Sequence, residues 1–318
     1  MERRDFLKTT AAAGLAVSLS GTGTAEEAHL SPMAKRPYGK TGERLSLVGL
    51  GGIVVMDMEQ SEADRTVAEA FDGGVNYFDV APSYGDGRAE ERLGPALQPF
   101  RSKVFLACKT EKRDKQGAED ELHTSLKRMR SDHFDLYQLH ALSKMEDLER
   151  VAGPNGALET FVKAKEKGLI RHIGFSAHSA EVALAALDRF PFDSVLFPFN
   201  FVTWHQANFG PQVLAKAKEK GVARLALKAL ARQPWPKDAD HGPYKNCWYQ
   251  PASDPKEAAL ALRFTLSQDI TAAIPPGEVS MFRLAVNIAR NFKPLEADEF
   301  KTVAALAQGL TPIFRLSS

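Results

Sequence analysis

Four side chains that could act together on a proton lie at the ends of three short apolar runs. Asp79 ends "VNYFD", and Tyr84 follows it in "APSYG". Lys109 ends "KVFLACK", and His140 ends "FDLYQLH". Each side chain also has an ordinary structural role: a turn cap, an aromatic lid, a solvated strand terminus or a structural histidine. Their spacing matters only if the fold brings the ends of these runs together.

Brought together, the four groups would form a proton donor. A free phenol has a pKa near ~10, and a neighbouring ammonium lowers that pKa. We therefore expect Lys109 to lower the pKa of Tyr84 while Asp79 holds Lys109 charged and oriented. His140 can hydrogen-bond the substrate oxygen or the phenol. Such a site would polarise a carbonyl and protonate the alkoxide as a hydride arrives, and the hydride must come from a cofactor.

The elements that must position these groups alternate regularly along the chain. Eight short apolar runs are each followed by a helical pattern, which favours an α/β fold, a (β/α)₈ TIM barrel. "RPYGKTGERL" predicts a β-hairpin before the first strand, and "EADEFKTVAALAQG" predicts an extra C-terminal helix. An open doubly wound sheet is the alternative, but "GLGGIVV" lacks the third glycine of its phosphate-binding turn. In a barrel, the carboxyl ends of all strands share one mouth.

The first residues differ from this pattern. Arg3 and Arg4 precede a mildly apolar stretch and small residues, the layout of a signal peptide. The paired arginines resemble the twin-arginine export signal of bacteria. We expect a signal peptide at 1–25, a linker at 26–36 and a barrel domain at 37–318, with export to the periplasm by the twin-arginine machinery. A first amphipathic helix is the alternative, disfavoured because no acidic residue interrupts 6–25.

The charge composition excludes some classes of binding partner. Basic and acidic residues number 41 and 40, a net charge of +1, so no basic field is available for nucleic acid or an anionic membrane. Small neutral or weakly charged ligands are the expected partners, with no stable membrane association after cleavage. Cys108 and Cys247 form no metal site by themselves, and the alternation of a strand makes a disulfide between them doubtful.

Several segments together resemble one family. "GVNYFDVAPSYG", "FLACKT", "DLYQLHAL", "IRHIGFSAH" and "ITAAIPPG" are similar to successive motifs of the aldo/keto reductases, over about residues 37–292. The resemblance implies reduction of aldehydes or ketones, or oxidation of alcohols, with NADP(H), NAD(H) being the alternative. Tyr84 would then be the general acid/base, with Lys109 and Asp79 tuning its pKa and His140 orienting the substrate.

The resemblance also implies cofactor contacts, and here the chain departs from the family pattern. The candidate residues are Gly52, Ser176, Asn200, Lys228, Gly277, Ser280, Arg283 and Asn287. Arg283 and Asn287 keep the family's Arg-x-x-x-Asn spacing, although a helix-surface arginine would look the same. Three usual nicotinamide contacts are replaced, by Ala177, Leu196 and Leu227.

The sequence also leaves two alternatives open, one for the role of an aromatic pair and one for the function of the protein. Trp248 and Tyr249 form either a substrate platform, suited to a sugar ring, or a plug that packs the loop onto the barrel. The principal hypothesis is an oxidoreductase, and the alternative is a non-catalytic protein of the same fold that binds a ligand or nucleotide. A hydrolase would need a carboxylate pair or a histidine-rich metal site at the strand ends, and neither is present.

Overall fold

The computed structural model describes residues 33–316. The expected signal peptide at 1–25 and most of the linker at 26–36 lie outside the described residues. The domain from 37 onward is therefore the part of the chain for which structure can be compared with prediction.

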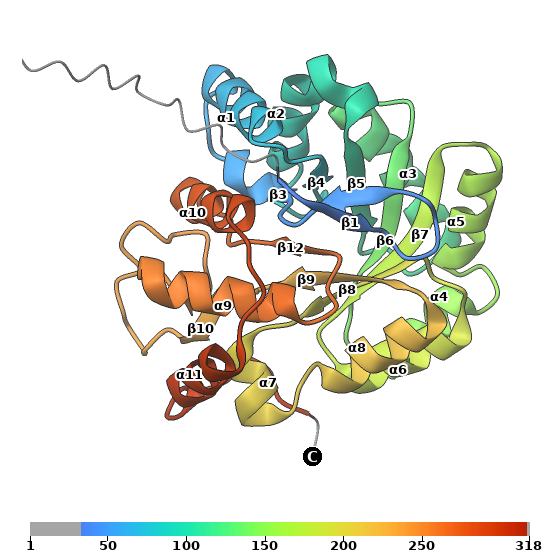
Figure 1. The fold of residues 1–318 in the computed structure, drawn as a ribbon. Helices are drawn as coiled ribbons and strands as arrows, with labels where there is room; N and C mark the ends of the chain where they lie inside the picture. The colour runs from blue at the N-terminus through green and yellow to red at the C-terminus, as the bar shows by residue number, and fades with distance from the viewer. Residues whose placement is uncertain (1–32, 317–318) are drawn as a thin grey trace, which may run out of the picture. The chain divides into compact units, whose positions relative to one another are not determined.

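Eight parallel strands form the central sheet, in the order β12-β9-β8-β7-β6-β5-β4-β3 (Figure 1). The strands are β3 (Leu50–Gly51), β4 (Tyr77–Asp79), β5 (Phe105–Thr110), β6 (Phe134–Leu142), β7 (Ile170–Ala177), β8 (Ser194–Pro198), β9 (Ala223–Leu227) and β12 (Ala272–Ile274). A parallel bridge between Val48 and Ala273 joins the first strand to the last, and the Gly49 amide donates to the Ala273 carbonyl at 3.0 Å. The predicted TIM barrel is confirmed.

Helices surround the strands (Figure 1). The expected ones are α1 (Gln60–Asp72), α2 (Arg88–Leu97), α3 (Lys115–Met129), α5 (Ala157–Glu166), α6 (Ala180–Arg189), α8 (Pro211–Lys220), α9 (Pro255–Ser267), α10 (Val279–Arg290) and α11 (Ala297–Ala307). Four further elements were not predicted from the sequence pattern: the helices α4 (Met145–Ala152) and α7 (Phe201–Ala207), and the 3₁₀ turns η1 (Gly52–Val55) and η2 (Gln98–Lys103). Pro95 lies inside α2 without dividing it.

The hairpin β1 (Lys35–Pro37) and β2 (Arg44–Ser46) lies across the strands in the foreground of Figure 1. Tyr38 and Leu45 from this hairpin are fully buried and pack with the barrel-interior side chains Tyr77, Phe105 and Leu136. The predicted hairpin is therefore present. It supplies apolar side chains to the barrel interior, which burial then stabilises.

The segment after the seventh barrel strand differs from expectation in two ways. The apolar run "VARLALKAL" predicts a strand at 222–230, but β9 ends at Leu227 and Lys228 takes a left-handed backbone conformation with φ of 61°. The prolines and glycines of 231–254 predict a long loop, but this segment contains an antiparallel hairpin of β10 (Ala231–Pro234) and β11 (Tyr249–Pro251). Pro234 and Pro251 lie at the ends of these short strands, where proline is tolerated, and Pro236 and Pro243 lie in the segment between the strands.

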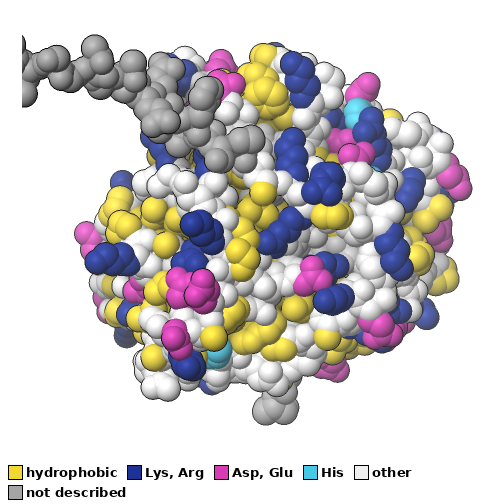
Figure 2. All heavy atoms as spheres, in the orientation of Figure 1, with side chains coloured by type: hydrophobic (Ala, Val, Ile, Leu, Met, Phe, Trp, Pro, Cys, Tyr) yellow, Lys and Arg dark blue, Asp and Glu magenta, His cyan; other side chains and the backbone are white. Residues whose placement is uncertain are grey.

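The surface agrees with the near-zero net charge. Figure 2 shows basic and acidic side chains interspersed over the face that carries the β1–β2 hairpin. Among the helices that the structure describes, none is both long enough and apolar enough to cross a bilayer.

Gly94 provides a test of how closely α2 and α3 pack. A Cβ at Gly94 would lie 2.6 Å from the Arg128 carbonyl oxygen and 2.7 Å from the Met129 Cα, so the helices would have to separate. We expect Gly94→Ala to lower the free energy of unfolding by about 1–3 kcal/mol, measured by urea denaturation. The matched control is Gly117→Ala in α3, which would meet only side-chain atoms and gains up to about 1 kcal/mol of helix propensity. Equal urea midpoints for the two variants would contradict the close packing.

Candidate active site

A cavity of 290 Å³ opens at the carboxyl ends of the barrel strands. Asp79, Tyr84, Lys109 and His140, the four residues expected to act on a proton, all line it. They come from the end of β4 and the loop after it, from β5 and from β6, which are neighbours in the sheet. The structure therefore brings together the whole set that the sequence singled out.

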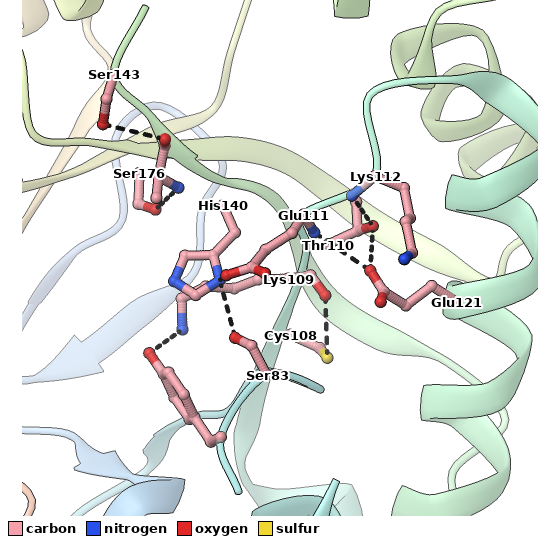
Figure 3. Close-up of polar contacts among 12 residues, drawn as sticks. Ser83, Cys108, Lys109, Thr110, Glu111, Lys112, Glu121, His140, Ser143 and Ser176 are labelled. Carbon is pink, nitrogen blue, oxygen red and sulfur yellow. Dashed lines mark hydrogen bonds and ion pairs between the residues drawn. The ribbon is translucent and has the colours of Figure 1, made fainter. Parts of the chain in front are cut away.

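Lys109 is the centre of the cluster. Its side chain is only 1% exposed, and its ammonium donates hydrogen bonds to an Asp79 carboxylate oxygen, to the Tyr84 phenol oxygen at 3.2 Å and to the Val80 carbonyl at 3.3 Å. All three protons of the ammonium thus have an acceptor. Figure 3 shows Lys109 extending away from β5 in a different direction from Cys108, as the alternation of a strand requires. Cys108 and Cys247 are both buried free thiols, which confirms that they do not form a disulfide.

The second oxygen of the Asp79 carboxylate is also satisfied. It accepts from the Tyr77 hydroxyl at 3.1 Å and from the Gln138 side-chain amide at 3.1 Å. Sequence reasoning missed both residues. Tyr77 lies two residues before Asp79 and so shares its face of the strand, and Gln138 is a polar residue within an apolar strand. Both signals are visible in the sequence once the barrel is assumed.

The pKa of Tyr84 differs from expectation. Burial raises the pKa of the phenol above its usual value, and the Lys109 ammonium opposes that rise without reversing it. Lys109 acts in the expected direction, but the expected net lowering is wrong because desolvation is the larger effect. Burial also disfavours the Lys109 ammonium, yet attraction to Asp79 and Tyr84 outweighs this and raises the pKa of Lys109. At neutral pH the cluster holds a protonated phenol beside a charged ammonium.

His140 contacts two groups that the sequence did not predict. Its Nδ1 lies 3.3 Å from a Glu111 carboxylate oxygen and 3.4 Å from the Ser83 hydroxyl (Figure 3). The His140 and Tyr84 rings meet edge to face, with centroids 5.9 Å apart. Burial lowers the pKa of His140, and the hydrogen bond that its ring donates to Glu111 opposes this. Because a carboxylate only accepts, a neutral ring donates from Nδ1 to Glu111 and keeps Nε2 as an acceptor.

The candidate cofactor residues divide into two groups. Ser176, Lys228 and Gly277 line the cavity. The Ser176 hydroxyl accepts from the Ala141 amide at 2.8 Å, which ties the ends of β6 and β7 together. Asn200 does not line the cavity; it is fully buried and caps α7, accepting from the Thr203 amide at 3.0 Å.

Arg283, Ser280 and Asn287 are exposed residues of α10, outside the cavity lining. Arg283 forms a two-pronged ion pair with Glu69 of α1, with N–O distances of 2.7 and 2.9 Å. Gly52 is buried, and a Cβ there would lie 2.7 Å from the Val80 side chain. Close packing alone is therefore sufficient to explain the absence of a side chain at Gly52.

The start of α10 carries an acidic residue that sequence reasoning overlooked. Glu278 precedes the helix and accepts from the Asn246 amide at 2.6 Å, which ties the long loop before β11 to α10. Burial raises the pKa of Glu278. No side chain caps the first amides of α10, so they remain available to an anion.

The aromatic pair Trp248 and Tyr249 lies at the cavity, but its members differ. Trp248 is 55% exposed, whereas Tyr249 is buried, and their rings meet edge to face. Of the two alternatives drawn from the sequence, Trp248 has the exposure that a substrate platform needs, whereas Tyr249 is buried as a plug would be. Leu196 and Leu227, two of the replaced nicotinamide contacts, line the cavity, and Ala177 is buried at the end of β7. Within residues 33–316, no cluster of three His, Cys, Asp or Glu side chains is suited to a metal ion.

The protein is a (β/α)₈ barrel whose cavity lies at the carboxyl ends of the strands, where the active sites of enzymes with this fold are found. The chain belongs to the aldo/keto reductase family, whose model, "Aldo/keto reductase family", matches residues 48–247. A second model, of the twin-arginine translocation pathway signal sequence, matches residues 1–20. The family assignment confirms the resemblance drawn from the motifs, and the signal match agrees with the paired arginines.

Curated relatives agree with this assignment, and a solved structure agrees with the fold. The chain is 26% identical over 300 residues to an uncharacterized oxidoreductase, YqkF, of Bacillus subtilis, covering 85% of this chain and 95% of that protein. It is also 26% identical to an L-galactose dehydrogenase of Arabidopsis thaliana, over 80% and 86% of the two chains. The fold is similar to that of a Bacillus halodurans aldo-keto reductase, AKR11C1, in its holo form, with a TM-score of 0.70, 24% identity and coverage of 88% and 98%.

The buried ion pair of Asp79 and Lys109 is open to a direct measurement. Asp79→Asn leaves a buried ammonium without its carboxylate, so we expect a loss of about 3–5 kcal/mol in the free energy of unfolding. Lys109→Met in the same chain should recover part of that loss, because the unpaired charge is gone. A double-mutant cycle by urea denaturation measures the coupling between the two residues.

The control cycle uses Asp57 and Arg88, an exposed ion pair with side chains 51% and 57% exposed. Its coupling should stay below about 1 kcal/mol. Additive effects of the Asp79 and Lys109 substitutions would show that the buried pair is not an energetic unit.

Proposed function

We propose that this protein is a nicotinamide-dependent carbonyl reductase in which Tyr84 is the general acid. The observation that supports this most strongly is the Lys109 ammonium, which contacts both the Asp79 carboxylate and the Tyr84 phenol inside the cavity. A substrate is an aldehyde or ketone, sugar-derived ones included, and the reverse reaction is oxidation of the alcohol.

The protonation state favours reduction at neutral pH. A general acid must hold its proton until charge develops on the substrate oxygen, and the raised pKa of Tyr84 keeps the phenol protonated. An alkoxide is a stronger base than a phenolate, so the proton transfers from Tyr84 as the alkoxide forms. The Lys109 ammonium then stabilises the phenolate. Alcohol oxidation requires the phenolate at the start, so its rate should rise with pH through the pKa of Tyr84.

The hydrogen-bond donors at and near the start of α10 suit a nicotinamide cofactor that carries phosphate groups. The uncapped amides at the start of α10 and the exposed guanidinium of Arg283 are groups that bind phosphate. We assign the 2′-phosphate of NADP(H) to Arg283, with NAD(H) as the alternative because Glu69 already pairs with that guanidinium. Ser176 and Gly277 would hold the nicotinamide side, and Gly52, Ser280 and Asn287 stay candidate contacts. When bound, the nicotinamide supplies the hydride.

A non-catalytic ligand- or nucleotide-binding protein is the second candidate. The observation that favours its ligand-binding form is Glu278, whose carboxyl group lies at the helix start where the phosphates of a dinucleotide are expected and would repel them. Ala177, Leu196 and Leu227, which replace usual nicotinamide contacts, also favour a protein that does not use the cofactor for catalysis. Titration with NADPH and NADH, followed by a turnover assay on aldehydes, separates the two candidates: binding without turnover supports the second.

Tyr84→Phe tests the general acid. We expect carbonyl reduction to fall by at least ~10²-fold, because the ring still packs while the donated proton is lost. Affinity for the dinucleotide, measured by protein fluorescence, should change little. The matched control is Tyr137→Phe, since the Tyr137 hydroxyl is buried on the outer side of β6 and lies outside the cavity lining. A Tyr84→Phe enzyme with most of its activity would exclude Tyr84 as the acid.

We also propose that the protein is exported folded to the periplasm by the twin-arginine machinery. Lysines in place of Arg3 and Arg4 should leave the protein in the cytoplasm, still folded, because the export pathway reads the arginine pair. Fractionation of cells followed by immunoblotting measures this. The control replaces Lys237 and Lys245, two exposed lysines of the segment between β10 and β11, with alanines, and export should continue. Normal export of the variant that lacks both arginines would contradict the proposal.

A further inference from the structure

Lys228 is a second lysine in the same cavity. It follows β9 directly, and its left-handed φ of 61° turns the chain so that the Lys228 carbonyl accepts from the Ala231 amide at 2.9 Å. Within residues 33–316, no carboxylate oxygen lies within 4.0 Å of its ammonium. A left-handed lysine is unfavourable by roughly 1–3 kcal/mol, and such strain concentrates at functional sites.

The neighbours of Lys228 leave its charge uncompensated. Its ammonium lies 3.4 Å from His178 Nε2 and over the rings of Trp248 and Phe314, at 5.7 and 5.9 Å from their centroids. The His178 ring stacks on Phe314. Burial and then the Lys228 charge lower the pKa of His178 to about 3, so this imidazole is neutral. Lone pairs and ring faces stabilise an ammonium but supply no negative charge.

The other charged groups of the cavity make the imbalance sharper. The Lys109 ammonium is matched by the Asp79 carboxylate, the one acidic residue among those that line the cavity. Burial, and then repulsion from Lys109, lower the pKa of Lys228 to about 8. Lys228 is therefore mostly protonated at neutral pH and gives the cavity one positive charge. An anionic ligand would remove the cost of that unpaired charge.

We propose that Lys228 binds a carboxylate of the substrate, so that the substrates are small carbonyl compounds that carry a carboxylate. This inference rests on the proposed carbonyl reduction. It assigns Lys228, expected from the sequence to contact the cofactor, to the substrate instead. The described neighbours of Lys228 are His178, Trp248 and Phe314, and none of them belongs to α10, where the phosphate-binding groups lie.

A carboxylate fits this position better than a phosphate does. Phosphate sites in proteins commonly use an arginine fork or a helix N-terminus, whereas a single lysine acts as a point charge. Neither a fork nor a helix start is among the described neighbours of Lys228. The cavity volume of 290 Å³ limits the substrate to a small molecule. The rings of Trp248 and Phe314 supply apolar surface beside the charge.

The test compares an aldehyde acid with its neutral ester. The wild-type enzyme and Lys228→Met are assayed with 4-carboxybenzaldehyde and methyl 4-formylbenzoate, and with glyoxylate and methyl glyoxylate as a shorter pair. We expect the wild-type enzyme to favour the acid in at least one pair. In Lys228→Met, the acid-to-ester ratio of kcat/KM should fall about 10–100-fold, the range of a charged hydrogen bond. Lys228→Arg should restore part of that ratio, and in the wild-type enzyme the ratio should decline above about pH 8.

Two further measurements separate the possible failures. An unchanged acid-to-ester ratio in Lys228→Met would overturn the proposal, as would a weakened affinity for the dinucleotide without a change in that ratio, which would return Lys228 to the cofactor. Binding of terephthalate, measured by calorimetry, needs no turnover. If no aldehyde is reduced, the proposed function fails, and terephthalate binding that is lost in Lys228→Met still supports the anion site. Equal terephthalate affinity in both proteins would overturn the anion site as well.

Discussion

The buried ion pair of Lys109 and Asp79 is the interaction on which the cavity depends. Removing two charges from water is costly, and the cost is offset only when every proton and lone pair finds a partner. Here the partners come from three adjacent strands: Tyr77 and Asp79 from β4, Lys109 from β5 and Gln138 from β6. The parallel register places Asp79 opposite Ala107 and Lys109 opposite Gln138. A slip of one residue in either pairing would turn a charge into the apolar layer outside the barrel.

Two opposing effects set the protonation of Tyr84. Burial favours the neutral phenol, and the Lys109 ammonium favours the phenolate. Sequence reasoning identified the ammonium because a lysine at a strand end is visible in the sequence. It underestimated desolvation, because burial depends on the loops that cover the cavity, and these come from distant parts of the chain. The net result, a phenol that keeps its proton at neutral pH, suits donation better than abstraction.

The sequence was sufficient to predict the barrel and the grouping of Asp79, Lys109 and His140 around Tyr84, because both follow from local patterns. Apolar runs alternate with helices, and the polar residues come directly at the ends of the runs. Contacts between distant segments left no such pattern. The pairing of Arg283 with Glu69, 214 residues apart, and the contact of Glu278 with Asn246 could not be predicted, nor could the β10–β11 hairpin. A proline-rich segment gives no periodic signal for such short strands.

The two lysines of the cavity differ in their counter-charges: Lys109 pairs with a carboxylate of the protein, and the described neighbours of Lys228 include none. We infer different roles for them from this difference. Lys109 has its counter-charge, Asp79, within the protein, so its ammonium is charged and in contact with Tyr84 before any ligand binds. Lys228 has ring faces and a neutral imidazole around it, and repulsion from Lys109 adds to the cost of its charge. A positively charged substrate would add a third cation to the ammonium groups of Lys109 and Lys228, and repulsion would disfavour its binding. Under the proposal, the negative charge arrives with the carboxylate of the substrate, and binding energy gained at Lys228, away from the reacting carbonyl, would orient that carbonyl toward Tyr84.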